Sequence, residues 1–140
     1  MTAVIDASLA LAWYFPDESS ALAEAVLRHL EGAALFVPAL WASEIANGIV
    51  VGIRRRRVTS ASKDQFLVLL AQLPIQIEPE LFPEHVQQVV ALAEAYQLTA
   101  YDAAYLELAL RRSARLATLD RELRRAARRA GVSLLPERLD

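Results

Sequence analysis

Short apolar runs alternate along the chain with longer stretches in which apolar residues recur at helical spacing. The apolar runs predict five strands, at 2–6, 34–37, 74–78, 115–118 and 132–135. The helical spacing predicts helices at 7–15, 19–31, 39–53, 59–73, 83–98, 100–113 and 121–130, with a break at Pro16–Glu18. Gly32 and Gly131 are expected to follow helix ends, and Thr59 is expected to cap the start of a helix.

Strands separated by helices are typical of βαβ units, in which a parallel sheet lies between helical layers. The expected fold is therefore α/β, with a mostly parallel sheet of four to five strands. The length of 140 residues and the lack of a linker or repeat predict one domain spanning 1–140. A hydrophobic fraction of 55% against 23% charged residues is typical of a chain with a proper core.

Composition excludes several kinds of site. The chain has no cysteine, so it can form no disulfide, thiolate nucleophile or cysteine zinc site. Its four glycines are too scattered for a glycine-rich phosphate loop. No apolar stretch reaches the roughly 18 residues of a membrane span, and Asp6 interrupts the first apolar run, which argues against a signal peptide. We therefore expect a cytoplasmic protein that makes no membrane contact.

Charge is segregated along the chain, although the net charge is only -2. Residues 1–53 hold six acids and one base, and residues 64–110 hold seven acids and no base. Residues 54–63 hold five bases and no acid, and residues 111–140 hold nine bases and four acids. This pattern indicates either a surface that faces a polyanion or helices of opposite sign that pair with each other.

Two aspartates follow predicted strands. Asp6 ends the first strand, and Asp120 comes directly after the fourth. Ligands of open parallel sheets bind beyond the carboxyl ends of the strands, which makes both residues candidates for a site. Each could equally cap the helix that follows it.

Glu44 and Asp102 fall on predicted inward helix faces. Their neighbours three and four positions away are mostly apolar. An ionised carboxylate in such a place is costly unless it is paired or binds a metal. Asp102 could instead belong to a capping box with Thr99, and Glu44 could belong to a buried salt bridge. Capping alone is a weak explanation for all four acids together.

A cluster made only of carboxylate oxygens suits Mg²⁺ or Mn²⁺ better than zinc. A metal-activated water could then attack phosphorus in line, which fits a chain that lacks a cysteine nucleophile. Ser8 and Thr118 stand two residues from Asp6 and Asp120 and could orient a ligand or a water.

The segments Val4–Ser8, Ser43–Glu44, Tyr101–Leu106 and Ala117–Asp120 resemble the PIN-domain nucleases, and within them the VapC-type toxins of toxin–antitoxin pairs. The resemblance extends over the whole chain in order and spacing. It implies an α/β/α sandwich, a Mg²⁺- or Mn²⁺-dependent endoribonuclease, a cognate antitoxin protein and a homodimer. The same motifs imply that four acids are catalytic and bind the metal: Asp6, Glu44, Asp102 and Asp120.

Fourteen of the fifteen basic residues are arginine, which favours bidentate contact with phosphate. RNA that approaches an acidic site needs basic surroundings, and the candidates for RNA contact are Arg121, Arg115 and Arg124. The residue Arg121 is the best placed of these, because it follows Asp120 directly.

Two other functions remain open at this stage. One is a catalytically inert PIN-like interaction domain, whose acids serve only as caps. The other is a metal-dependent phosphohydrolase that acts on a different phosphate ester. A phosphatase with a nucleophilic aspartate usually has a second acid two residues further on, but position 8 is a serine.

Overall fold

A computed structural model of the chain describes residues 1–15 and 20–139. The predicted break at Pro16–Glu18 lies outside the described residues. Five strands form one parallel sheet: β1 (Thr2–Ile5), β2 (Ala34–Val37), β3 (Ile75–Ile77), β4 (Arg115–Ala117) and β5 (Leu134–Leu135). Their order across the sheet is β3-β2-β1-β4-β5. The predicted parallel sheet is confirmed.

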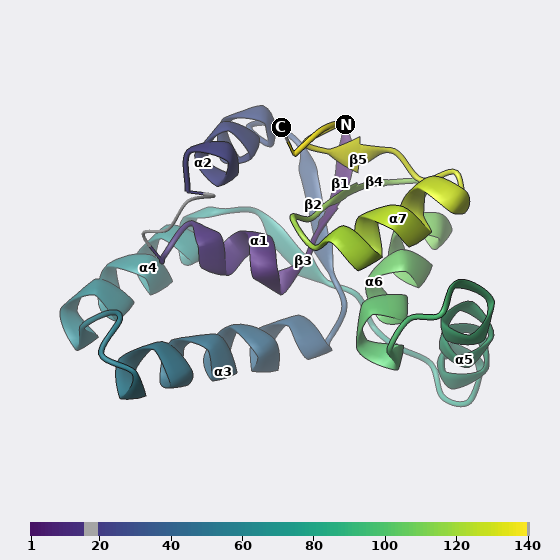
Figure 1. The fold of residues 1–140 in the computed structure, drawn as a ribbon, viewed down its shortest axis with the longest axis horizontal. Helices are drawn as coiled ribbons and strands as arrows, with labels where there is room; N and C mark the ends of the chain where they lie inside the picture. The colour runs from purple at the N-terminus through teal and green to yellow at the C-terminus, as the bar shows by residue number, and fades with distance from the viewer. Residues whose placement is uncertain (16–19, 140) are drawn as a thin grey trace.

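Seven helices connect these strands within the described part of the chain: α1 (Ala7–Ala12), α2 (Ser20–His29), α3 (Leu40–Arg54), α4 (Ser60–Gln72), α5 (Glu84–Tyr96), α6 (Ala100–Arg111) and α7 (Arg121–Arg129). Crossovers between parallel strands are right-handed, so the direction in which the chain moves across the sheet decides which face the connecting helices cover. The connections from β1 to β2 and from β2 to β3 move one way, and those from β3 to β4 and from β4 to β5 move the other way. Figure 1 accordingly shows α1 to α4 on one side and α5 to α7 on the other. This is the predicted α/β/α sandwich.

The central strands are the most buried part of the fold. Val4 and Ile5 of β1 and Leu116 of β4 have no exposed surface. Strands covered by helices on both faces are expected to read as continuous apolar runs rather than alternating ones. The apolar runs of the central strands therefore predict them clearly from the sequence. The edge strand β3 is less covered, and its residues Gln76 and Ile77 are exposed.

Several elements end earlier than predicted. The first helix stops at Ala12 rather than at residue 15, because the amides of Trp13 and Tyr14 bond to carbonyls three residues back and tighten the last turn. Gly32 and Gly131 both adopt a positive φ of 80° just after a helix, as expected of residues that follow helix ends. Thr59 is confirmed as a cap, because its hydroxyl accepts a hydrogen bond from the amide of Ser62 at 3.1 Å.

Within the described residues no salt bridge joins two helices, so the predicted pairing of helices of opposite sign is wrong. The charge pairs at the carboxyl end of α6 lie within that helix or join it to the residue that follows β3. Glu78 and Glu107 are each 5% exposed. Arg111 bonds to both at 2.9–3.1 Å, and Arg112 pairs with Glu78. Part of the segregated charge therefore stabilises the packing of α6 against the end of β3.

No helix in the described ranges is long and apolar enough to cross a membrane.

Candidate functional site

The order of the strands reverses between β1 and β4. From β1 the chain first moves toward β3, and after it returns to β4 it moves the other way. Open α/β sheets bind ligands at such a switch point, beyond the carboxyl ends of the strands. Asp6 follows β1 and Asp120 lies shortly after β4, and the amide of Asp6 bonds to the carbonyl of Ala117 at 3.1 Å. The two aspartates therefore lie at the switch point.

Asp6 is held in place by three donors. The amide of Leu9 bonds to Oδ1 at 2.9 Å, the hydroxyl of Ser8 bonds to both carboxylate oxygens at 2.8 and 2.9 Å, and the hydroxyl of Thr118 bonds to Oδ2. Asp6 is 4% exposed. Burial raises its pKa from 3.8 to about 6, the hydrogen bonds oppose this rise, and the charge of Asp120 adds to it. Asp6 is thus both a helix cap and a desolvated carboxylate whose orientation is fixed by hydrogen bonds.

Asp120 also caps a helix. Its Oδ2 accepts the amide of Leu123 at 3.3 Å at the start of α7, and its own amide donates to the hydroxyl of Thr118 at 3.0 Å. Thr118 is completely buried and bonds to Asp6 as well. A single hydroxyl therefore joins the two aspartates, and each of them also caps a helix.

Glu44 lies on α3 and is partly buried. Its partner is Tyr105 on α6, whose hydroxyl donates to Oε1 at 2.6 Å. Burial, this hydrogen bond, and the negative charges of Glu44 and Asp6 all raise the pKa of Tyr105. The tyrosine therefore remains a neutral donor and lies close to both acids. The alternative that Glu44 sits in a buried salt bridge is wrong within the described residues, where its recorded partner is a tyrosine.

Asp102 lies in the first turn of α6, where its amide donates to the hydroxyl of Thr99 at 3.1 Å. The second hydrogen bond of a full capping box, which the amide of Thr99 would donate to the carboxylate of Asp102, is not formed among the residues described. Burial and the charges of Asp120 and Glu44 raise the pKa of Asp102 to about 6. Its carboxylate therefore faces other acids and is not used as a cap.

These electrostatic effects connect all four acids. Asp6 is affected by Asp120, and Asp102 is affected by both Asp120 and Glu44. Repulsion of this kind is relieved by a bound cation, and the donor set contains only oxygen, which suits a hard divalent ion. In the described ranges, no three acidic or histidine side chains are already grouped closely enough to hold one ion. The four acids are close enough to raise one another's pKa values, as the shifts of Asp6 and Asp102 show.

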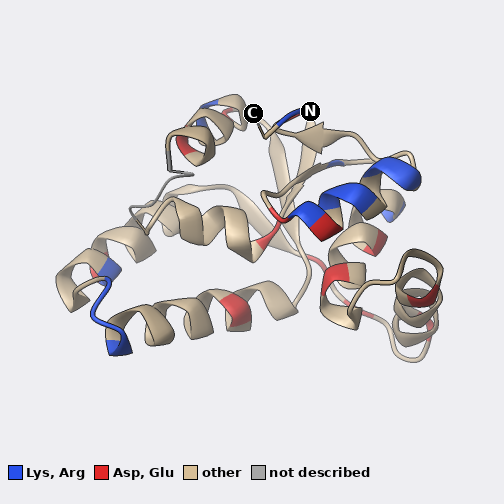
Figure 2. Ribbon diagram, in the orientation of Figure 1, with Lys and Arg blue, Asp and Glu red and all other residues tan. Residues whose placement is uncertain are grey.

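The three arginines predicted to contact RNA lie in different places. Arg121 is exposed at the start of α7 and next to Asp120, where Figure 2 shows acidic and basic residues meeting. Arg124 is 1% exposed, and its guanidinium donates to the carbonyls of Thr118, Pro136 and Glu137 at 2.6–3.1 Å. Arg115 is the first residue of β4, so it lies at the amino ends of the strands, whereas the acids lie beyond their carboxyl ends. The structure brings only Arg121 and Arg124 near the acidic cluster.

Tyr105 contacts the site through its side chain, and sequence reasoning assigned it no role. It stands three positions after Asp102, which places both side chains on one face of α6. That spacing was the available signal, but its partner Glu44 is 61 residues away and no local pattern reveals such a contact.

Comparisons with known proteins agree on one family. The sequence profile of the PIN domain matches residues 3–129. Ribonuclease VapC3 of Pyrobaculum aerophilum is 32% identical over 123 residues, which are 88% of this chain and 92% of that protein. Two solved structures share the fold: PAE2754 of the same organism, with a TM-score of 0.68 and 23% identity, and FitAcB of Neisseria gonorrhoeae, with 0.62 and 18%. They cover 97% and 94% of this chain, and 93% and 95% of their own.

Proposed function

This chain belongs to the PIN-domain family, and from that premise we propose that it is a metal-dependent endoribonuclease, the toxin of a toxin–antitoxin pair. The observation that carries the proposal is the electrostatic coupling of four acids at the switch point of the sheet: Asp6, Glu44, Asp102 and Asp120. The similarity to ribonuclease VapC3 over most of both chains supports RNA as the substrate.

The acids have separate tasks in this proposal. Asp6 and Asp102, whose pKa values are both raised to about 6, are the two principal ligands of Mg²⁺ or Mn²⁺. Glu44 and Asp120 add negative charge on either side of these two ligands. A divalent ion held there would neutralise the phosphodiester and make water more acidic at neutral pH. The four ionised carboxylates repel RNA in the absence of the ion, so binding of the ion and binding of the substrate are coupled.

Neighbouring hydroxyls position these acids. Ser8 and Thr118 restrict the carboxylate of Asp6 to one orientation, and Thr118 fixes the backbone of Asp120 through the amide of that residue. Tyr105 orients Glu44 in the same way from α6. Partners of this kind keep ligating side chains in place and commonly change metal affinity or activity when they are removed.

An apolar groove between α3, α4 and β3 is the proposed docking place for the antitoxin, in keeping with the toxin assignment. The groove has a volume of about 590 Å³, and its lining includes Trp41, Ile49, Leu67 and Ile77. Leu67 and Ile77 are 45% and 57% exposed, so a partner that covers them would remove apolar surface from water. Homodimerisation and a place in the cytoplasm belong to the same proposal.

Cleavage of RNA by the purified full-length protein tests the proposal. We expect cleavage of single-stranded RNA with Mg²⁺ or Mn²⁺, no cleavage in EDTA, and no cleavage by Asp6→Asn or Asp102→Asn. Calorimetric titration with Mn²⁺ provides a readout that does not depend on activity, and each substitution should weaken the binding of the ion. Cleavage that persists in EDTA and in the double variant would contradict the mechanism.

If no RNA is cleaved, the same preparations distinguish the remaining functions. Mn²⁺ binding with hydrolysis of another phosphate ester would replace RNA as the substrate. The absence of both metal binding and hydrolysis would identify an inert interaction domain.

A further inference from the structure

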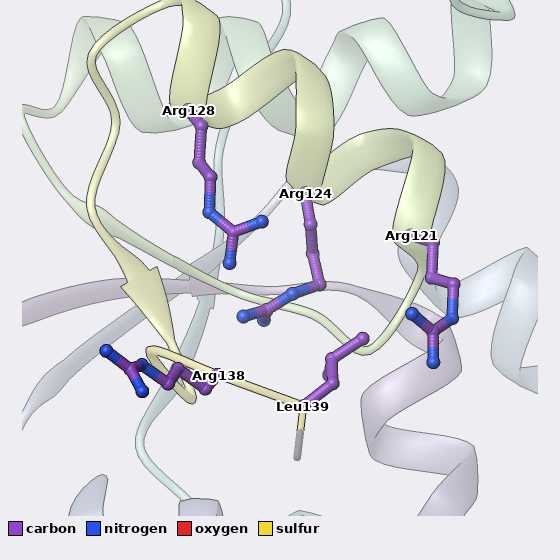
Figure 3. A pocket seen from close by; sticks show the side chains of 5 residues that line it. All are labelled: Arg121, Arg124, Arg128, Arg138 and Leu139. Carbon is purple, nitrogen blue, oxygen red and sulfur yellow. The ribbon is translucent and has the colours of Figure 1, made fainter.

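A basic pocket of about 510 Å³ lies between α7 and the C-terminal segment that follows β5. Arginines make up all of its lining except one leucine: Arg121, Arg124, Arg128, Arg138 and Leu139. Figure 3 shows three of these arginines projecting from one face of α7 toward the segment that carries the other two residues. Positions 121, 124 and 128 share that face because they are three and four residues apart.

The arginines of the basic pocket differ in what they bind. All guanidinium contacts of Arg124 go to backbone carbonyls, and Arg128 donates to the carbonyl of Glu137 at 3.2 Å. The guanidinium groups of Arg121 and Arg138 make no hydrogen bond to another residue in the described part of the chain. Over residues 1–15 and 20–139, none of the four forms a salt bridge with an acid. Among the residues that the structure describes, the pocket therefore carries positive charge that no carboxylate neutralises.

This concentration of charge acts on the buried member of the set. Burial and the charges of Arg128 and Arg121 lower the pKa of Arg124. An anion in the pocket would offset this repulsion, and a phosphate group matches the planar fork of guanidinium donors.

One residue joins the basic pocket to the acidic cluster. The hydroxyl of Thr118 donates to Asp6, and its carbonyl accepts Nη1 of Arg124 at 2.8 Å. Arg121 follows Asp120 directly. An RNA strand with one phosphodiester at the acids would therefore pass the start of α7, and a neighbouring phosphate could reach the pocket.

We propose that the basic pocket binds a backbone phosphate of the RNA next to the phosphodiester at the acids. Arg121, Arg128 and Arg138 contact this phosphate, whereas Arg124 holds the C-terminal segment in place and so shapes the pocket. The proposal rests on the proposed function, because it takes RNA as the ligand. RNA is favoured over an acidic protein segment because the pocket adjoins the acidic cluster, where the substrate needs compensating positive charge.

The test measures binding of a short fluorescein-labelled single-stranded RNA by fluorescence anisotropy over a range of salt concentrations. The protein is the full chain with Asp6→Asn, which prevents loss of the probe by cleavage. Arg128→Gln and Arg138→Gln are added singly, and Arg125→Gln is the matched control, because Arg125 lies on the same helix but outside the pocket. Thermal unfolding confirms that each variant is folded.

We expect roughly tenfold weaker binding for Arg128→Gln and for Arg138→Gln, with the slope of log affinity against log salt reduced by about 0.7 for each lost contact. Arg125→Gln should bind nearly as tightly as its parent. Equal binding by all variants would overturn the proposal, and so would unchanged RNA binding with weaker binding of a partner protein. Failure of the wild-type chain to cleave RNA counts against the proposed function alone, because the binding series is read independently of cleavage.

Discussion

The hydroxyl of Tyr105 donates a 2.6 Å hydrogen bond to Oε1 of Glu44 and so joins α6 to α3. The two helices cover opposite faces of the sheet, and they meet beyond its carboxyl end (Figure 1). This contact fixes the distance between Glu44, from one helical layer, and Asp102, from the other. The geometry of the acidic cluster therefore depends on a residue that is neither acidic nor a metal ligand.

Tyr105→Phe removes this hydroxyl and keeps the ring that fills the core. We expect kcat/KM for RNA cleavage to fall about 10- to 100-fold, because Glu44 loses its orienting donor. The free energy of unfolding should fall by only about 1 kcal/mol. Steady-state cleavage and urea unfolding measure the two effects separately. Tyr14→Phe is the matched control, since Tyr14 is also buried and its hydroxyl reaches the carbonyl of Thr59 only at 3.5 Å. Similar losses in both variants would show that Tyr105 acts through packing.

Asp6→Asn should abolish cleavage and yet stabilise the metal-free protein at pH 7.5. The ionised carboxylate of Asp6 is buried among hydroxyls and near Asp120, so the neutral amide avoids a cost that the aspartate bears. Thermal unfolding in EDTA should show a higher Tm for the variant. Asp64→Asn is the control, because the side chain of Asp64 is 74% exposed, and its Tm should remain that of the wild type. A lower Tm for Asp6→Asn would mean that the hydrogen bonds to Asp6 outweigh its desolvation.

The metal-free protein should lose stability as pH rises from about 4 to above 6. Asp6 and Asp102 have a pKa of about 6 in the fold against an ordinary value of 3.8, so the folded state binds more protons than the unfolded state in this range. The stabilisation is complete below the unfolded pKa and is lost through the folded one. For Asp6 the difference amounts to about 3 kcal/mol.

Urea unfolding at pH 5 and pH 7.5 in EDTA measures this loss. Mg²⁺ should reverse it at pH 7.5 and have little effect at pH 5, because the ion binds the ionised carboxylates. The double variant with Asp6→Asn and Asp102→Asn should show neither response. A wild-type protein that is equally stable at both pH values would contradict the raised pKa values.

Sequence periodicity predicted the strands and helices well, because the central strands are apolar on both faces and glycines follow α2 and α7. Asp6 and Asp120 are predicted as site residues for a topological reason, because the carboxyl ends of parallel strands lie at the same end of the sheet. The ends of helices were less accurate, as at Trp13, since a tightened final turn depends on local hydrogen bonds rather than on apolar spacing.

Contacts between distant segments could not be predicted in the same way. Arg124 was expected to face RNA, but it is buried against Pro136 and Glu137, which fold back over α7 after β5. Closeness in sequence groups Arg115 with Arg121 and Arg124 as a candidate for RNA contact. Arg115 begins β4, however, and so lies at the opposite end of the strand from Asp120. Charge counted along the chain does not tell which edge of a sheet a residue occupies.

Arg124→Gln should destabilise the protein by about 2–4 kcal/mol. The substitution leaves the buried carbonyl of Thr118 and the partly buried carbonyls of Pro136 and Glu137 without their charged donor. Urea unfolding measures the loss, and Arg125→Gln on the same helix should cost less than about 1 kcal/mol, because its pair with Glu122 is exposed. A small effect of Arg124→Gln would mean that water replaces the guanidinium at these carbonyls.

A charge placed on the lining of the groove between α3, α4 and β3 should weaken binding of the proposed antitoxin. Leu67→Glu puts a carboxylate on an apolar wall, and burying that charge in a complex would cost several kcal/mol. The free protein should remain stable, since Leu67 is 45% exposed. Co-purification with the antitoxin that the proposed function requires measures binding. Val68→Glu is the matched control, because Val68 is 59% exposed and does not line the groove. Loss of binding in the control alone would move the docking surface to the outer face of α4.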